Sequence, residues 1–140
     1  MSETVHATCV AIAGRAVLIG GRSGAGKSDL ALRMIDRGAL LVSDDYTLLR
    51  AQGGRLLASA PPAISGKMEV RGLGIVEMEP LAEAPVCLAV DLDTPPPRMP
   101  EPSSVAYLGL ELPAIAFAAL EASAPIKLEQ ALARFGLPLP

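Results

Sequence analysis

An apolar run that leads directly into a glycine-rich loop constrains the fold of this chain more than any other feature of its sequence. Residues 16–19 begin the run AVLIG, which is typical of a buried strand, and residues 21–28 read GRSGAGKS, which matches the pattern G-x-x-x-x-G-K-S. Residues 27–37 then carry apolar side chains at helical spacing, and Gly38 is a good helix stop. Strand, glycine loop and helix in this order predict a phosphate-binding loop, and the alternative is a glycine turn that happens to precede a helix.

Each residue type in this loop suits the binding of a nucleoside triphosphate. The glycines let the backbone wrap closely, so that several N–H groups point at phosphate oxygens, and the helix that begins near Lys27 adds its positive end. Lys27 supplies a mobile cation for the β- and γ-phosphates, and the hydroxyl of Ser28 offers a ligand to Mg²⁺. The loop therefore predicts binding of ATP or GTP with Mg²⁺. The predicted nucleotide-binding residues are Gly21, Arg22, Ser23, Gly24, Ala25, Gly26, Lys27 and Ser28.

Two aspartates follow the next apolar run. Residues 39–42 read ALLV, a second predicted buried strand, and Ser43, Asp44 and Asp45 come directly after it. If this strand is parallel to AVLIG, a right-handed crossover brings its carboxyl end beside the glycine loop. One carboxylate could then hold the metal through water while the other takes a proton from an acceptor hydroxyl. The alternative is a solvated turn, because Asp-Asp favours turns.

The chain as a whole predicts one α/β domain over residues 1–140, with a largely β core, a few flanking helices and no N-terminal domain before it. The expected elements are a strand at 4–11, a hairpin of 46–50 with 55–58, short strands at 67–71 and 75–78, a strand at 86–92, a proline-rich loop at 94–104 and a helix at 125–134. In the strand at 67–71, Lys67, Glu69 and Arg71 share one face, which by itself indicates an ordinary solvated surface.

Composition and charge exclude several classes of function. The net charge is −3 and no basic patch stands out, which argues against nucleic-acid binding and against docking on an anionic membrane. The N-terminal residues MSETVHATC lack the features of a secretory signal, and no apolar stretch is long enough to span a bilayer. Cys9 and Cys87 both lie in apolar runs, which indicates buried thiols and a reducing compartment. We therefore expect a cytoplasmic protein.

Four ordered segments together resemble the catalytic domain of HPr kinase/phosphorylase, a family that phosphorylates a serine on HPr, the small carrier protein of the bacterial phosphotransferase system. The segments are VHATCV, GRSGAGKSDLAL, RGALLVSDD and MEVRGLGIVEM. The resemblance, which is to short forms such as those of alphaproteobacteria, implies a P-loop kinase-like fold, ATP and Mg²⁺ as cofactors, HPr as the protein partner and a homo-oligomer, which is a hexamer in the family. It also implies the reverse reaction, in which phosphate attacks phosphoserine and pyrophosphate is released.

The resemblance also implies roles for individual residues. The positions that match catalytic residues of the family are His6, Lys27, Asp45 and a later arginine, for which Arg98 is the candidate. The positions that match its magnesium ligands are Ser28 and Glu69. Asp45 matches the residue that accepts the proton during phosphorylation and returns it in the reverse step. The C-terminal stretch that the family uses in dephosphorylation has no counterpart in PAIAFAALEASAPIKLEQ, so the sequence predicts the kinase more directly than the phosphorylase.

Two alternatives from other classes stay open on the sequence. A kinase of small metabolites would use the same loop, although such enzymes usually need a closing segment that excludes water, and the sequence suggests none. A non-catalytic regulatory module would bind ATP tightly without turnover. In such a module Asp45 and Glu69 would be dispensable.

Overall fold

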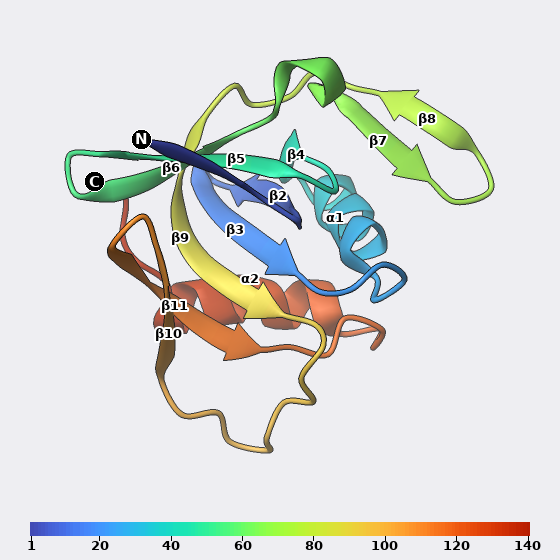
Figure 1. The fold of residues 1–140 in the computed structure, drawn as a ribbon. Helices are drawn as coiled ribbons and strands as arrows, with labels where there is room; N and C mark the ends of the chain where they lie inside the picture. The colour runs from blue at the N-terminus through green and yellow to red at the C-terminus, as the bar shows by residue number, and fades with distance from the viewer.

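A strongly curved nine-stranded sheet forms the centre of the molecule in the computed structural model, which describes residues 1–140 (Figure 1). In chain order the elements are β1 (Ser2–Val5), β2 (Ala7–Ile12), β3 (Arg15–Gly20), α1 (Lys27–Asp36), β4 (Leu40–Ser43), β5 (Thr47–Gln52), β6 (Arg55–Ser59), a 3-10 turn (Pro62–Ile64), β7 (Lys67–Val70), β8 (Gly74–Glu77), β9 (Ala84–Asp91), β10 (Ser103–Tyr107), β11 (Leu110–Ala116) and α2 (Ala124–Phe135). The predicted class, α/β with a largely β core, is confirmed.

The strand order along the main path of the sheet is β1-β5-β6-β9-β3-β2-β4. The hairpin of β10 and β11 joins this sheet because β11 pairs with β9 in parallel. Strands β7 and β8 form a separate two-stranded hairpin that projects from the body beyond α1 (Figure 1). The hairpin expected around Gly53 and Gly54 is β5 with β6.

The pairing around β3 decides where the predicted site residues lie. β3 pairs in parallel with β9 and antiparallel with β2, and β4 pairs antiparallel with β2. β4 therefore runs in the same direction as β3, although β2 separates the two strands. The carboxyl ends of β3 and β4 consequently lie at one edge of the sheet, where the glycine loop and the two aspartates meet, as the crossover argument predicts.

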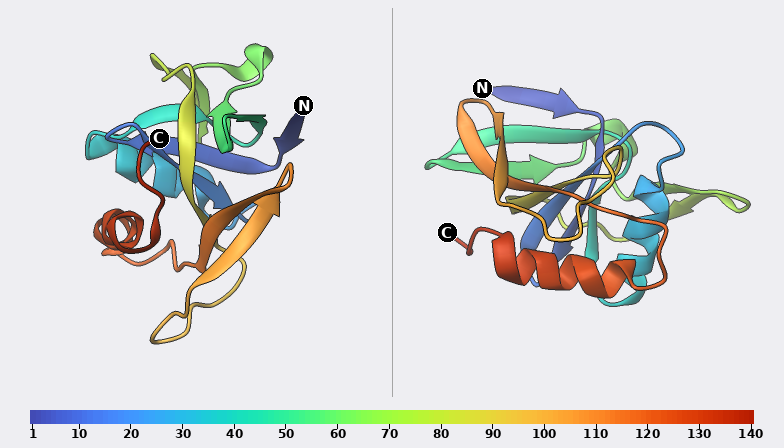
Figure 2. Two further views of the ribbon diagram at one scale, coloured as in Figure 1. Left: turned by 90° about the vertical axis from the view of Figure 1, so that its left-hand side faces the viewer. Right: turned by 90° about the horizontal axis from the view of Figure 1, so that it is seen from below.

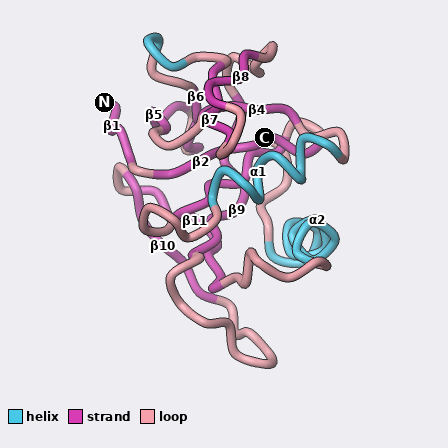
Figure 3. The backbone as a smooth tube through the Cα atoms, turned by 90° about the vertical axis from the view of Figure 1, so that its right-hand side faces the viewer, coloured by secondary structure: helices cyan, strands magenta, loops and turns pink.

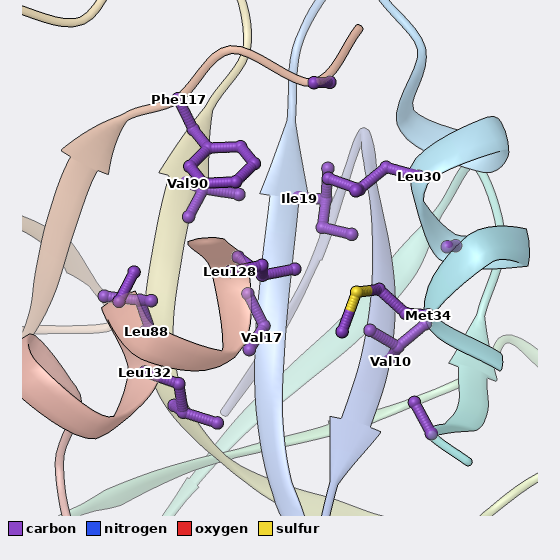
Figure 4. Packing of buried hydrophobic residues seen from close by; sticks show 14 of the residues in the cluster. Val10, Val17, Ile19, Leu30, Met34, Leu88, Val90, Phe117, Leu128 and Leu132 are labelled. Carbon is purple, nitrogen blue, oxygen red and sulfur yellow. The ribbon is translucent and has the colours of Figure 1, made fainter. Parts of the chain in front are cut away.

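The central strands are apolar on both sides because both faces of the sheet are covered. On β3, Val17 and Ile19 face the two helices, whereas Ala16 and Leu18 belong to the core on the opposite face. Figure 4 shows the helix-side core, in which Leu30 and Met34 of α1 approach the sheet. The other residues labelled there are Val10, Leu88, Val90, Phe117, Leu128 and Leu132.

Polar contacts hold the two helices to the sheet and to each other. Arg37, just after α1, donates to Glu129 of α2 with a distance of 2.6 Å from Nη2 to Oε1. Arg15 on β3 donates to the carbonyls of Leu132 and Leu137 at the end of α2. Figures 2 and 3 show both helices on the same side of the sheet. Neither helix is long and apolar enough to cross a membrane.

Two features differ from the sequence predictions. The strand expected at 4–11 is two strands that separate at His6, because β1 pairs with β5 while β2 pairs with β3 and β4. The hairpin of β10 and β11 was not predicted, because β11 contains Pro113 and its apolar residues do not alternate. The proline is tolerated because pairing with β9 begins only at Ala114, so its missing N–H is not needed on that side.

Candidate active site

The glycine-rich loop turns tightly between β3 and α1. Gly24 and Gly26 have φ angles of +85° and +101°, a left-handed region that would cost other residues about 1–2 kcal/mol. Lys27 is buried, and its Nζ donates to the carbonyl oxygens of Gly21 at 2.6 Å and Arg22 at 3.0 Å. The ammonium group of Lys27 therefore lies over the first residues of the loop.

Asp93, which follows β9, holds the start of the glycine-rich loop in place. Both carboxylate oxygens of Asp93 lie 3.0 Å from the backbone N of Arg22, and Oδ1 also accepts from the Arg22 guanidinium at 3.1 Å. Asp91 accepts in turn from the hydroxyl of Thr94 and the backbone N–H of Asp93, and these hydrogen bonds lower the pKa of Asp91. Asp93 was not identified from the sequence, because nothing between the predicted strand at 86–92 and the proline-rich loop indicates a contact with a loop 71 residues away.

Asp44 is the buried centre of the hydrogen bonding at the site. Its Oδ1 accepts from the hydroxyl of Ser28 at 2.6 Å and from the hydroxyl of Thr8 at 3.1 Å. Its Oδ2 accepts from the backbone N–H of Glu69 at 3.2 Å. One carboxylate therefore joins the start of α1, strand β2 and strand β7, and it brings Ser28 close to the segment that carries Glu69.

Asp45 lies beside the only histidine of the chain. Nε2 of His6 is 2.9 Å from Oδ1 of Asp45, and both side chains are exposed. Because a carboxylate can only accept, the shared proton is on Nε2. The ring of Tyr46 lies 5.1 Å from that of His6, and the hydroxyl of Thr8 accepts from the backbone N–H of Asp45. The break between β1 and β2 gives His6 this position at the edge of the sheet.

The hairpin of β7 and β8 presents Glu69 next to this cluster. Met68 is fully buried and Val70 is half-buried, whereas Lys67 and Glu69 are exposed, so the predicted alternation along the strand is confirmed. Arg98, in contrast, is exposed on the loop between β9 and β10 and makes no hydrogen bond or ion pair with the other predicted site residues. The fold brings His6, Lys27, Ser28, Asp45 and Glu69 to one edge of the sheet but leaves Arg98 outside their contacts.

Residues 1–82 match the family model described as the HPr Serine kinase C-terminal domain. This chain belongs to that family. The matched residues include the glycine loop, the two aspartates and Glu69, but they do not include Arg98.

Relatives that are named HPr kinase/phosphorylase agree with this membership. The protein from Clostridium tetani is 44% identical over 77 residues, which are 55% of this chain and 25% of that protein. The protein from Geobacillus thermodenitrificans is 36% identical over 126 residues, which are 80% of this chain and 41% of that protein. The chain thus spans less than half the length of these curated relatives.

A solved structure, the HPr(Ser) kinase/phosphatase from Coxiella burnetii, has a similar fold. Its TM-score to this structure is 0.82 at 29% sequence identity, and the similarity covers 94% of each chain. The likeness therefore extends beyond residue 82 and includes α2 and the hairpin of β10 and β11, where the sequence motifs are weak.

Proposed function

We propose that this chain transfers the γ-phosphoryl group of ATP, with Mg²⁺, to a serine of HPr. The observation that carries this proposal is the pairing of His6 with Asp45, 2.9 Å apart and next to a loop built to hold phosphates. The names of the relatives in Clostridium tetani and Geobacillus thermodenitrificans support HPr as the acceptor. A cytoplasmic location and a homo-oligomer belong to the same proposal.

The residues present fit a magnesium ion that arrives with the nucleotide. Mg²⁺ prefers oxygen ligands and in nucleotide sites is usually held by one or two carboxylates together with the phosphates. Ser28 and Asp44 already share a hydrogen bond of 2.6 Å, and the backbone of Glu69 contacts the second oxygen of Asp44. We assign Ser28 and Glu69 as the ligands that would hold the ion, and Asp44 holds the hydroxyl of Ser28 and the backbone of Glu69. When bound, the ion would neutralise charge on the β- and γ-phosphates.

The proposed transfer requires one proton acceptor and several fixed positive groups. Asp45 takes the proton of the serine hydroxyl while the serine oxygen bonds to the γ-phosphorus and the bond to ADP breaks. His6 donates Nε2–H to Asp45 and so orients the carboxylate. Lys27 and the loop N–H groups stabilise the charge that spreads over the transferred group. A role for Arg98 in this charge neutralisation stays a prediction.

We include the reverse reaction in the proposal because the relatives carry the word phosphorylase in their names. In that direction inorganic phosphate attacks the phosphorus of phosphoserine and releases pyrophosphate. The serine oxygen then receives the proton that Asp45 holds. Addition of phosphate to phosphorylated HPr, with detection of pyrophosphate, tests this part independently of the kinase.

The decisive experiment is phosphoryl transfer from γ-labelled ATP to purified HPr in the presence of Mg²⁺. One control uses HPr with its acceptor serine changed to alanine, and another uses the Asp45→Ala variant of this chain. We expect label on HPr that is lost in both controls, while ATP binding by Asp45→Ala stays close to that of the unsubstituted protein. Intact ATP binding without any label would contradict the proposal and favour a regulatory module or another acceptor.

A further inference from the structure

A cavity of about 470 Å³ opens at the edge of the sheet beside the proposed active site, and most of the residues that line it are apolar. Leu18 and Ala89 form part of its lining from the central strands, and Val105 and Ala114 contribute from the hairpin of β10 and β11. Val105 and Ala114 lie on the inner face of that hairpin, packed against the core of this face of the sheet. The strands β3, β9 and β11 run side by side toward this edge (Figure 1).

Two observations place the cavity at the acceptor end of the phosphate loop rather than at the nucleoside end. Lys27, whose ammonium group serves the β- and γ-phosphates in such loops, has its Nζ 2.6 Å from the carbonyl oxygen of Gly21, and Gly21 lines the cavity. His6 also lines the cavity and is the partner of Asp45, the proposed proton acceptor. The group that receives the phosphoryl must approach from this side.

The charges and polarity of the lining residues also determine which kind of chemical group the cavity can bind. No lysine or arginine lines it, and the carboxylate of Asp91 lies at its wall. Hydrogen bonds from Thr94 and from the backbone of Asp93 lower the pKa of Asp91, so this carboxylate stays charged and repels a polyphosphate. An uncharged apolar group is therefore the best occupant.

We propose that this cavity binds an apolar side chain of the acceptor protein, next in space to the serine that is phosphorylated, and so selects the acceptor. The inference rests on the proposed function. A leucine, isoleucine, methionine or phenylalanine side chain would enter between Leu18 and the β10–β11 hairpin while the serine hydroxyl reaches Asp45. Burial of the side chain would then orient the serine for transfer.

The test alters the cavity without changing the proposed catalytic residues. Ala114→Leu fills the cavity, Val105→Ala enlarges it, and Ala106→Leu is the matched control because Ala106 is exposed and does not line the cavity. Thermal unfolding of each variant establishes that it is folded. Transfer from ATP to HPr gives kcat and KM for the acceptor, and calorimetric titration with ATP in the absence of HPr gives the affinity for nucleotide.

We expect Ala114→Leu to lower kcat/KM for HPr by roughly tenfold or more, because a pocket discriminates by about that factor for each methylene. Val105→Ala should give a smaller loss, and ATP affinity should be unchanged in all three variants. The inference predicts at least one apolar residue beside the acceptor serine of HPr whose substitution by alanine reproduces this loss with the unsubstituted enzyme. In the Ala114→Leu variant, the same substitution in HPr should lower kcat/KM little further.

Three results would contradict the inference. If Ala114→Leu and Val105→Ala transfer to HPr as Ala106→Leu does, the cavity has no part in acceptor binding. If both weaken the affinity for ATP instead, the cavity holds the nucleoside. Absence of transfer by the unsubstituted chain would contradict the proposed function and this inference together, whereas the first two results leave the proposed function standing.

Discussion

The carboxylate of Asp44, just after β4, accepts a hydrogen bond at 2.6 Å from the hydroxyl of Ser28, which lies on α1. The same carboxylate accepts from Thr8 and from the backbone of Glu69, so its three partners come from α1, β2 and β7. Asp44 itself is 5% exposed. The buried carboxylate of Asp44 therefore holds three elements of the fold together, and it also lies beside the proposed metal site.

Asp44→Asn should therefore lower both stability and metal affinity. The amide oxygen can still accept from Ser28 and Thr8, but the amide NH₂ would face the N–H of Glu69, and two donors would be left unpaired. We expect a loss of about 1–3 kcal/mol in the free energy of unfolding. The Mg²⁺ concentration for half-maximal transfer should rise as well.

Denaturant unfolding and a magnesium titration of the transfer reaction measure these two effects. Asp36→Asn is the matched control, because Asp36 is exposed at the end of α1 and should change stability by less than about 0.5 kcal/mol. Equal stability of the two variants would show that the hydrogen bonds of Asp44 are not needed for folding.

Substitution of Asp45 should separate catalysis from stability. Asp45 has a φ angle of +68°, the left-handed region in which glycine is unstrained. Asp45→Gly should consequently be about 1–2 kcal/mol more stable than Asp45→Ala. Both variants should lose about 10²–10⁴-fold in kcat, because both lack the proton acceptor. Thermal unfolding and initial rates with HPr measure the two quantities, and rapid transfer by the glycine variant would exclude the assigned role.

The local patterns of the sequence predict the glycine loop, α1 and the acidic pair, because strand, loop and helix are contiguous there. They do not predict the contacts of Thr8, which lies 36 residues from Asp44 and joins it only after β2 has paired with β4. That His6 and Asp45 belong to one site was expected from the resemblance to a family and not from any spacing. A single histidine near the N-terminus carries no local pattern of its own.

The topology was only partly predictable for a related reason. The direction of β4 follows from a crossover rule, but nothing local indicates that β2 would lie between β3 and β4. The hairpin of β10 and β11, which lines one wall of the cavity, was missed because its inner face is only half-buried and Pro113 interrupts its pattern. Strands that are distant in the sequence pair because their apolar side chains become buried in the folded protein, and a local sequence pattern does not show that burial.

The thiol of Cys9 should be unreactive in the folded protein. Cys9 is fully buried, and desolvation together with the proximity of Cys87 raises the pKa of the Cys9 thiol far above its usual value. Thiolate is the reactive form, so at pH 8 a disulfide reagent should react with native protein at least about 100-fold more slowly than with free cysteine, as judged from thiolate fraction and access. Both cysteines should react rapidly in denaturant, and fast modification of Cys9 in native protein would show that the core opens there.

Two glycines of the segment that carries Glu69 should respond differently to alanine. Gly66 has a φ angle of +73°, and a Cβ built there would lie 2.7 Å from the carbonyl oxygen of Met78. This close approach accompanies the hydrogen bond from the N–H of Met78 to the carbonyl of Gly66, which closes the base of the β7–β8 hairpin. Gly66→Ala thus combines backbone strain with a clash against backbone.

Gly72 at the tip of the same hairpin has a φ angle of +88°, but no atom lies within 4 Å of the position that a Cβ would take there, so Gly72→Ala adds strain alone. We expect a loss of about 1–2 kcal/mol in unfolding free energy for Gly72→Ala and a larger loss for Gly66→Ala. Only Gly66→Ala should also raise the magnesium requirement of transfer, because it displaces the strand that positions Glu69 against Asp44. Denaturant unfolding distinguishes the two variants. Equal losses of unfolding free energy would mean that the backbone at the base of the hairpin relaxes and relieves the clash at Gly66.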